Sequence, residues 1–176
     1  FNPEAELVNA SLATTIVRLE KIGISSAQSA KTMDFFVRTL RVSEQEASDL
    51  TVELALMGAQ MGLTSSQIID DFSKVSSDLA IYGGNAIQVF KDLEAQAKAT
   101  GMEIGSLVQM AKQFDTFDQA ADKAAQLNAV LGTQLSAIDL MNMSYDERVN
   151  YIRQEVSFAA GNLENLDQYT QQFIQQ

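Results

Sequence analysis

Proline, the residue that interrupts a helix most strongly, occurs once in these 176 residues, as Pro3. Beyond that position glycine and small polar residues must mark the helix ends. Three such marks share one order, a glycine, then an apolar and a polar residue: Lys21-Ile22-Gly23-Ile24-Ser25, Gln60-Met61-Gly62-Leu63-Thr64 and Ala99-Thr100-Gly101-Met102-Glu103. Because glycine adopts the left-handed conformation that closes a helix, we expect these glycines at helix C-caps, with the apolar residue packing back.

Helix starts are marked by serine or threonine. Ser25 with Gln28 and Thr64 with Gln67 have the spacing of a capping box. The same spacing gives two further starts, at Ser43 with Glu46 and at Ser144 with Glu147. Between the marks, apolar residues recur every three or four positions, as in the stripe Ile68, Phe72, Val75 and Leu79. No segment alternates convincingly at period two, so we expect no sheet.

These marks predict helices near 4–22, 25–41, 43–61, 64–82, 85–100, 104–114, 116–131, 134–142, 144–160 and 165–175. The predicted fold class is therefore all-α, a compact multi-helix domain of about ten short helices with glycine C-caps and orthogonal or solenoid-like packing. Gly23, Gly62 and Gly101 are evenly spaced. That spacing is compatible with a helical-hairpin repeat, and a succession of unrelated short helices also gives it.

A chain of this length buries roughly 70% of its unfolded surface on folding, which is enough for a real core. We expect residues 1–176 to form a single helical domain, with a subdivision near 101–115 as the alternative. The chain does not begin with Met, and its last stretch, Gln168 to Gln176, has the character of a helix interior. We therefore expect a segment of a longer protein.

Composition restricts the chemistry. Twelve Lys and Arg stand against 23 Asp and Glu, a formal net charge of −11, which argues against direct nucleic-acid binding. His, Cys and Trp are absent, so the usual general base, thiolate nucleophile and zinc ligands are missing. No apolar run approaches the ~18 residues of a membrane span. We expect no enzyme activity, no cofactor and no membrane span.

Two groups of carboxylates are candidates for a reactive or metal-binding site. The first is Asp70, Asp71 and Asp78, and the second is Asp115, Asp118 and Asp122. Neighbouring helical positions point about 100° apart, so the first group is better explained as a solvated helix face. The second lacks the alternate ligand spacing and the glycine of an EF-hand. Helix capping by Asp115 or Thr116 explains its first member better, and the helix dipole favours Asp118.

Two features indicate packing surfaces. Gly58 and Gly62 have a small-xxx-small spacing, which in a soluble helix indicates close packing followed by a C-cap. Near the end of the chain, Tyr169, Phe173 and Ile174 lie among glutamines. This stripe could pack against copies of itself or a partner helix, or it could cover its own domain. We take these three residues as the expected partner contacts.

Several phrases in the middle of the chain resemble the tail tape measure and related virion structural proteins of tailed bacteriophages, over roughly residues 35–170. The phrases are Tyr82-Gly83-Gly84-Asn85-Ala86-Ile87-Gln88-Val89-Phe90, Ala97-Lys98-Ala99-Thr100-Gly101, Phe114-Asp115-Thr116-Phe117-Asp118-Gln119-Ala120-Ala121, Leu127-Asn128-Ala129-Val130-Leu131-Gly132 and Asp146-Glu147-Arg148-Val149.

The resemblance implies a long, mostly helical protein that lies in several copies inside the tail tube and fixes its length. Its implied partners are copies of itself, as a trimer or hexamer, together with tail tube and baseplate hub proteins. The implied location is the virion tail, assembled in the host cytoplasm. The alternative is an acidic helical adaptor or regulatory module that binds a basic or apolar peptide in a groove between helices.

Overall fold

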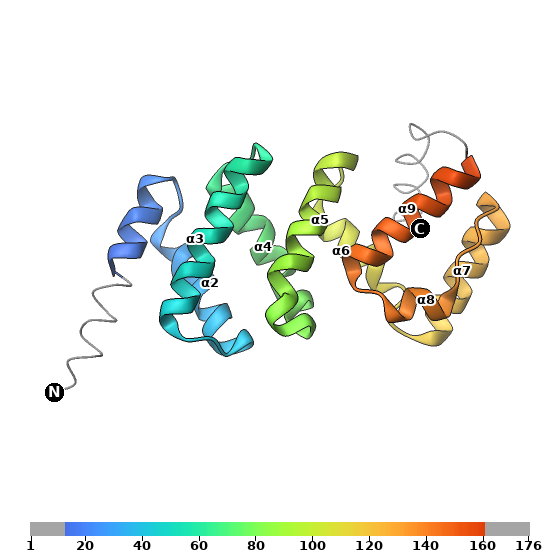
Figure 1. Cartoon of the computed structure of the whole chain (residues 1–176), viewed down its shortest axis with the longest axis horizontal. Helices are drawn as coiled ribbons and strands as arrows, with labels where there is room; N and C mark the ends of the chain where they lie inside the picture. The colour runs from blue at the N-terminus through green and yellow to red at the C-terminus, as the bar shows by residue number, and fades with distance from the viewer. Residues whose placement is uncertain (1–12, 161–176) are drawn as a thin grey trace. The chain divides into compact units, whose positions relative to one another are not determined.

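A computed structural model of the chain describes residues 13–160, which are helical throughout apart from short connections and contain no strand. A helix over 13–21 comes first. The numbered elements follow in the order α2 (Ser26–Phe35), η1 (Phe36–Leu40), α3 (Glu44–Met61), α4 (Ser65–Leu79), η2 (Ala80–Asn85), α5 (Ala86–Thr100), α6 (Ile104–Lys112), α7 (Phe117–Leu131), α8 (Ala137–Asn142) and α9 (Tyr145–Ala160) (Figure 1).

The number of helices differs from the expected ten. Among the described residues there are eight numbered α-helices, α2 to α9, and each corresponds to one predicted segment. The helix expected over 165–175 lies outside the described residues, as does the first half of the one expected over 4–22. Two predicted segments also change character at their ends. Residues 36–40 form a π-helical turn, and residues 80–85 form a 3-10 turn.

The chain divides into two compact units, Phe1–Ala86 and Ile87–Gln176. The division follows the 3-10 segment η2, whereas the sequence placed an alternative subdivision near 101–115. Residues 101–115 instead contain α6 and the buried Phe114, which belongs to the core of the second unit.

Two helix starts form the capping boxes that the sequence predicts. The Gln28 amide N–H donates to Ser25 Oγ at 3.2 Å, and the Ser25 amide donates to Gln28 Oε1 at 2.9 Å. Thr64 and Gln67 repeat this exchange at the start of α4. Glu103, the polar residue after Gly101, is the N-cap residue of α6, but its side chain makes no capping hydrogen bond.

Gly23, Gly62 and Gly101 all have the positive φ expected of them, as does Gly132 at the end of α7, but glycine C-caps are not general in this fold. Gly62 ends α3 in the left-handed conformation at φ 71°, and the amide of Leu63 donates to Gly58 O at 2.8 Å. By contrast, α2 continues directly into η1, and α6 and α8 end at Gln113 and Met143 with negative φ.

The core of the first unit is built from α2, η1, α3 and α4. The ring of Phe72 on α4 lies 5.5 Å from Phe35 and 5.4 Å from Phe36, measured between centroids. Helices α3 and α4 approach closely at Gly58, where an added Cβ would lie 3.1 Å from Ile68 Cγ2. This contact confirms the close packing predicted from the small-xxx-small spacing.

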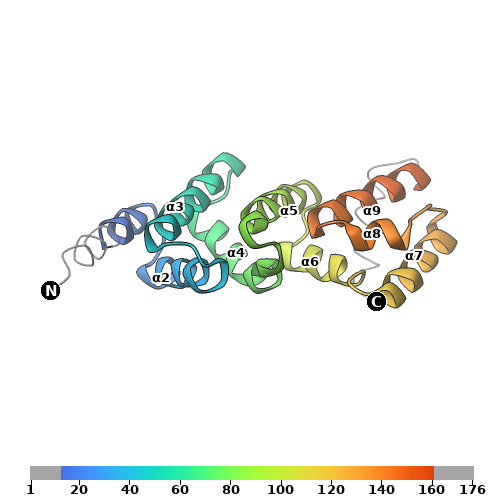
Figure 2. The same cartoon turned by 60° about the horizontal axis from the view of Figure 1, so that its bottom comes forward.

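The core of the second unit includes a cluster contributed by α7, α8, α9 and the segment after α6. In both views the short helix α8 lies between α7 and α9 (Figure 2). The buried side chains of the cluster are Phe114, Ala120, Ala124, Leu127, Leu135, Leu140, Ile152 and Val156. The small side chains Ala120 and Ala124 on α7 are buried in this cluster, so the neighbouring helices can approach α7 closely.

Candidate functional site

Arg148 is the best-connected polar residue of the second unit. It lies on α9 with only 6% of its surface exposed. Its Nε donates to Leu140 O at 2.7 Å, and its Nη1 donates to Ala111 O at 2.9 Å and to Asp115 Oδ1 at 2.6 Å. Ala111 and Leu140 lie in the last turns of α6 and α8, where their carbonyls also accept the backbone N–H of Phe114 at 3.1 Å and of Met143 at 3.3 Å. One guanidinium therefore binds the ends of two helices.

The carboxylate of Asp115 is held from two sides. Its second oxygen, Oδ2, accepts a hydrogen bond from the Tyr145 hydroxyl at 3.1 Å. The Arg148 guanidinium also lies 5.3 Å from the centroid of the Tyr145 ring. Each oxygen of the carboxylate therefore accepts one hydrogen bond. This arrangement fixes α6, α8 and α9 together.

Asn128 near the end of α7 plays a similar positioning role. Its Oδ1 accepts from the amide of Leu135 at 2.7 Å and from Thr133 Oγ1 at 2.7 Å, and its Nδ2 donates to Leu135 O at 3.0 Å. The chain between α7 and α8 is therefore held against α7. Asp115, Asn128 and Arg148 each lie in one of the phrases that carry the resemblance.

The first group of carboxylates lies on α4 and is held by other side chains. Asp70 accepts from Gln28 Nε2 at 2.7 Å, and Asp71 pairs with Lys74 Nζ at 2.7 Å. Asp70 is exposed and Asp71 and Asp78 are partly exposed. Nowhere in residues 13–160 do three or more potential ligand side chains gather as a metal site would require.

The second group separates in the structure. Asp115 binds Arg148, and Thr116 is the residue that caps α7, accepting from the amide of Gln119 at 3.4 Å. Of the two capping candidates, Thr116 is therefore the correct one. Asp118 and Asp122 are exposed on α7, and Asp118 lies in the first turn as the dipole argument expects.

Asp146, in the first turn of α9, is the acidic side chain with a perturbed pKa. Burial raises the pKa of this carboxyl above its ordinary value, and a hydrogen bond from Ser144 Oγ at 2.6 Å opposes the shift. Repulsion from Asp92 and Glu147 adds to the increase in the pKa. Asp146 also accepts at its backbone oxygen from Gln96 Nε2 at 3.0 Å, which ties α5 to α9.

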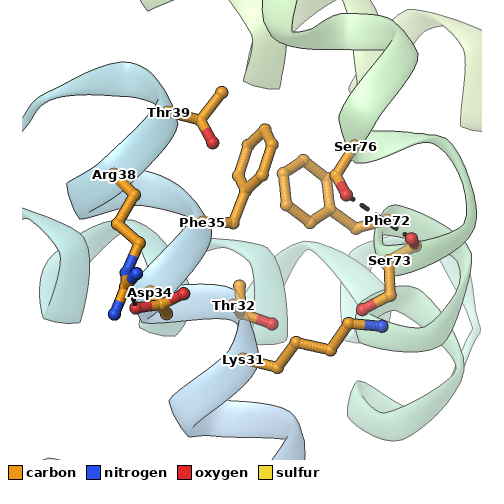
Figure 3. A pocket seen from close by; sticks show the side chains of 9 residues that line it. All are labelled: Lys31, Thr32, Asp34, Phe35, Arg38, Thr39, Phe72, Ser73 and Ser76. Carbon is orange, nitrogen blue, oxygen red and sulfur yellow. Dashed lines mark hydrogen bonds and ion pairs between the residues drawn. The ribbon is translucent and has the colours of Figure 1, made fainter.

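The first unit contains a pocket of about 240 Å³ between α2, η1 and α4 (Figure 3). The rings of Phe35 and Phe72 form its apolar wall. This pocket could not be predicted from the sequence, because its lining comes from segments far apart in the chain, residues 31–39 and 72–76. A π-helical turn, such as the one that presents Arg38 and Thr39 here, is a feature often found at functional sites.

The expected partner contacts Tyr169, Phe173 and Ile174 lie outside the described residues. Within residues 13–160 the large apolar side chains that are most exposed are Phe158 at 87%, Val130 at 80% and Ile81 at 69%. The sequence also left Arg148 unassigned. The signal was its spacing, since position 148 shares one helix face with the apolar Tyr145 and Ile152.

Comparison of this chain with protein-family models, with curated proteins and with solved structures finds no match. The structure adds one finding on membranes. Across the described part of the chain, none of the helices combines the length and the apolar character needed to cross a bilayer.

Proposed function

We propose that this chain is a folded helical module of a phage tail tape measure protein, and that it works by packing against other proteins. The observation that carries the proposal is the role of the resembling phrases. Asp115, Asn128 and Arg148 come from three of these phrases, and all three hold helix ends and a connection in the second unit.

The lengths of the helices support a module rather than the rod itself. A continuous helix of this chain's length would extend about 260 Å at 1.5 Å per residue. The longest described helix, α3, has 18 residues. We therefore assign the measuring rod to other parts of the parent protein, and this segment to docking on the tube lumen or the baseplate hub.

Exposed apolar side chains in the second unit support a docking role. Phe158 on α9 and Val130 on α7 are 87% and 80% exposed, and Ile138 on α8 is 63% exposed. Aromatic side chains such as Phe158 are enriched at protein interfaces, whose fully buried centre is more apolar than the rest of the protein surface. The strongly acidic composition would repel DNA passing through the same channel.

Light scattering of the purified chain tests the proposed arrangement around the tail axis. We expect a mass of three or six times the 19.2 kDa of one chain, at low and at moderate salt. Phe158→Ser should lower this mass, whereas Ile81→Ser, a matched change of an exposed residue in the first unit, should leave it unchanged. A monomer across the concentration range would contradict the proposed assembly.

A second candidate function, an acidic adaptor that binds an apolar peptide, is favoured by the pocket of the first unit. The Phe35 and Phe72 rings give that pocket an apolar wall between helices, where one apolar side chain of a peptide could insert. A monomer that binds one apolar peptide tightly would favour the adaptor over the tape measure module.

A further inference from the structure

The pocket of the first unit combines an apolar wall with polar groups on one side. Phe35 and Phe72 stand edge to face with their centroids 5.5 Å apart. In Figure 3 the hydroxyl of Thr32 is turned to the side on which Lys31 and Ser73 lie. The volume of about 240 Å³ is below the ~300–1,000 Å³ of sites for drug-sized ligands, which limits an occupant to one ring with a short arm.

Thr32, which lines the pocket, has a buried hydroxyl that could serve a bound molecule. Its residue is only 2% exposed, and its Oγ1 has no hydrogen-bond partner. A buried hydroxyl without a partner destabilises the folded chain, and an acceptor on a bound molecule would relieve that cost. Threonine in a helix has two accessible χ1 rotamers, so the hydroxyl can turn toward such an acceptor.

The charges around the pocket favour an anionic acceptor. The carboxylate of Asp34 on the rim is paired with Arg38 Nε at 2.5 Å. Lys31 has no acidic partner among residues 13–160, so its charge remains uncompensated at the pocket. An ammonium beside hydroxyl groups attracts an anion locally, although the chain as a whole carries a net charge of −11.

We propose that this pocket binds a small aromatic monocarboxylate. The ring lies against Phe35 and Phe72, and the carboxylate accepts hydrogen bonds from Thr32 Oγ1 and Lys31 Nζ. Offset or edge contacts between aromatic rings supply the attraction on one side, and charge-assisted hydrogen bonds supply it on the other. This site is independent of the proposed role in a phage tail.

Titration of the full chain with 3-phenylpropionate, followed by amide chemical shifts in NMR, tests the site. We expect saturable shifts at residues 32, 35, 72 and 73, with a dissociation constant on the order of 1 mM. The neutral amide of the same acid should bind about tenfold more weakly, because it lacks the charge. Absence of saturable shifts up to about 50 mM would overturn the proposal, as would equal binding of the amide.

Two pairs of variants distinguish the site from general effects. Lys31→Gln should weaken binding about tenfold, whereas Lys21→Gln, the same change outside the pocket, should not. Thr32→Val should weaken binding about fivefold without loss of stability, because it removes an unpartnered hydroxyl. Ser29→Ala removes another buried hydroxyl without a partner on the same helix and should leave binding unchanged. Equal effects within either pair would overturn the assignment.

Discussion

Arg148 and Asp115 meet across 33 residues of sequence, with 2.6 Å between Nη1 and Oδ1. The arginine side chain is 7% exposed and the aspartate side chain 37%, so the pair lies at the edge of the core of the second unit. The Arg148 guanidinium also donates hydrogen bonds to Ala111 O and Leu140 O, and this side chain therefore joins the ends of α6 and α8 to α9.

Arg148→Met is therefore expected to destabilise the chain strongly. It removes one hydrogen-bond donor from each of two carbonyls and the cationic partner from the Asp115 carboxylate. Breaking a buried pair costs about 3–5 kcal/mol. Since Asp115 is partly exposed, we expect about 2–4 kcal/mol, measured by urea unfolding and circular dichroism. Arg38→Met removes the exposed pair with Asp34 and should cost less than about 1 kcal/mol. Equal costs would contradict the role of Arg148.

Gly58 is expected to resist substitution by alanine. Alanine in a helix normally gains about 0.5–1 kcal/mol over glycine. Here its Cβ would lie 3.1 Å from the backbone oxygen of Thr64 and from Ile68 Cγ2, so we expect a net loss of about 1–2 kcal/mol. Gly105→Ala on α6 meets nothing within 4 Å and should gain stability. Thermal unfolding of both variants decides the point, and a stabilised Gly58→Ala would refute the close approach.

Gly62→Val should cost about 1–2 kcal/mol, because φ is 71° at this C-cap and a branched side chain is strained there. At Arg41 the opposite substitution, to glycine, should stabilise the chain. Arg41 follows η1 at φ 58° and is the one non-glycine residue with positive φ between residues 13 and 160. Arg41→Gly should therefore raise the free energy of unfolding, by up to about 1 kcal/mol. Urea unfolding measures both, and an unchanged Gly62→Val variant would contradict the strained C-cap.

Asp146 makes stability depend on pH in an unusual direction for a carboxyl. Its pKa is raised in the folded chain, so folding favours the protonated form, and stability falls as the pH rises through that raised pKa. Asp146→Asn removes this effect and keeps an acceptor for Ser144. Its melting temperature relative to the unchanged chain should increase between pH 3 and pH 7. A difference that is constant with pH would contradict the shift.

Local signals in the sequence predicted most of the helix positions. Capping residues such as Ser25 and Thr64 act within three residues, so their effect can be recognised without knowing the fold. The π-helical turn at residues 36–40 was missed, because it depends on burial of Phe36 beneath Phe72. The spacing of apolar residues along one helix cannot predict a π-helical turn that depends on packing against another helix.

The sites were harder to predict than the helices. The sequence suggested helix capping by Asp115 or Thr116, whereas the partner of Asp115 is Arg148 on α9, the third helix after it. The pocket at Phe35 likewise depends on Phe72, 37 positions further along the chain. Both depend on which helices become neighbours, and the apolar pattern of a single helix contains no information on its partner.

The most direct test of a structural role in a phage tail is to look for the chain in particles. Quantitative mass spectrometry would compare purified tailed particles, before and after DNA ejection, from the host that carries this gene. We predict peptides of residues 13–160 at a few copies per intact particle and their loss from emptied tails, while the tail tube protein remains in both. Intact particles that contain none of these peptides would contradict the account.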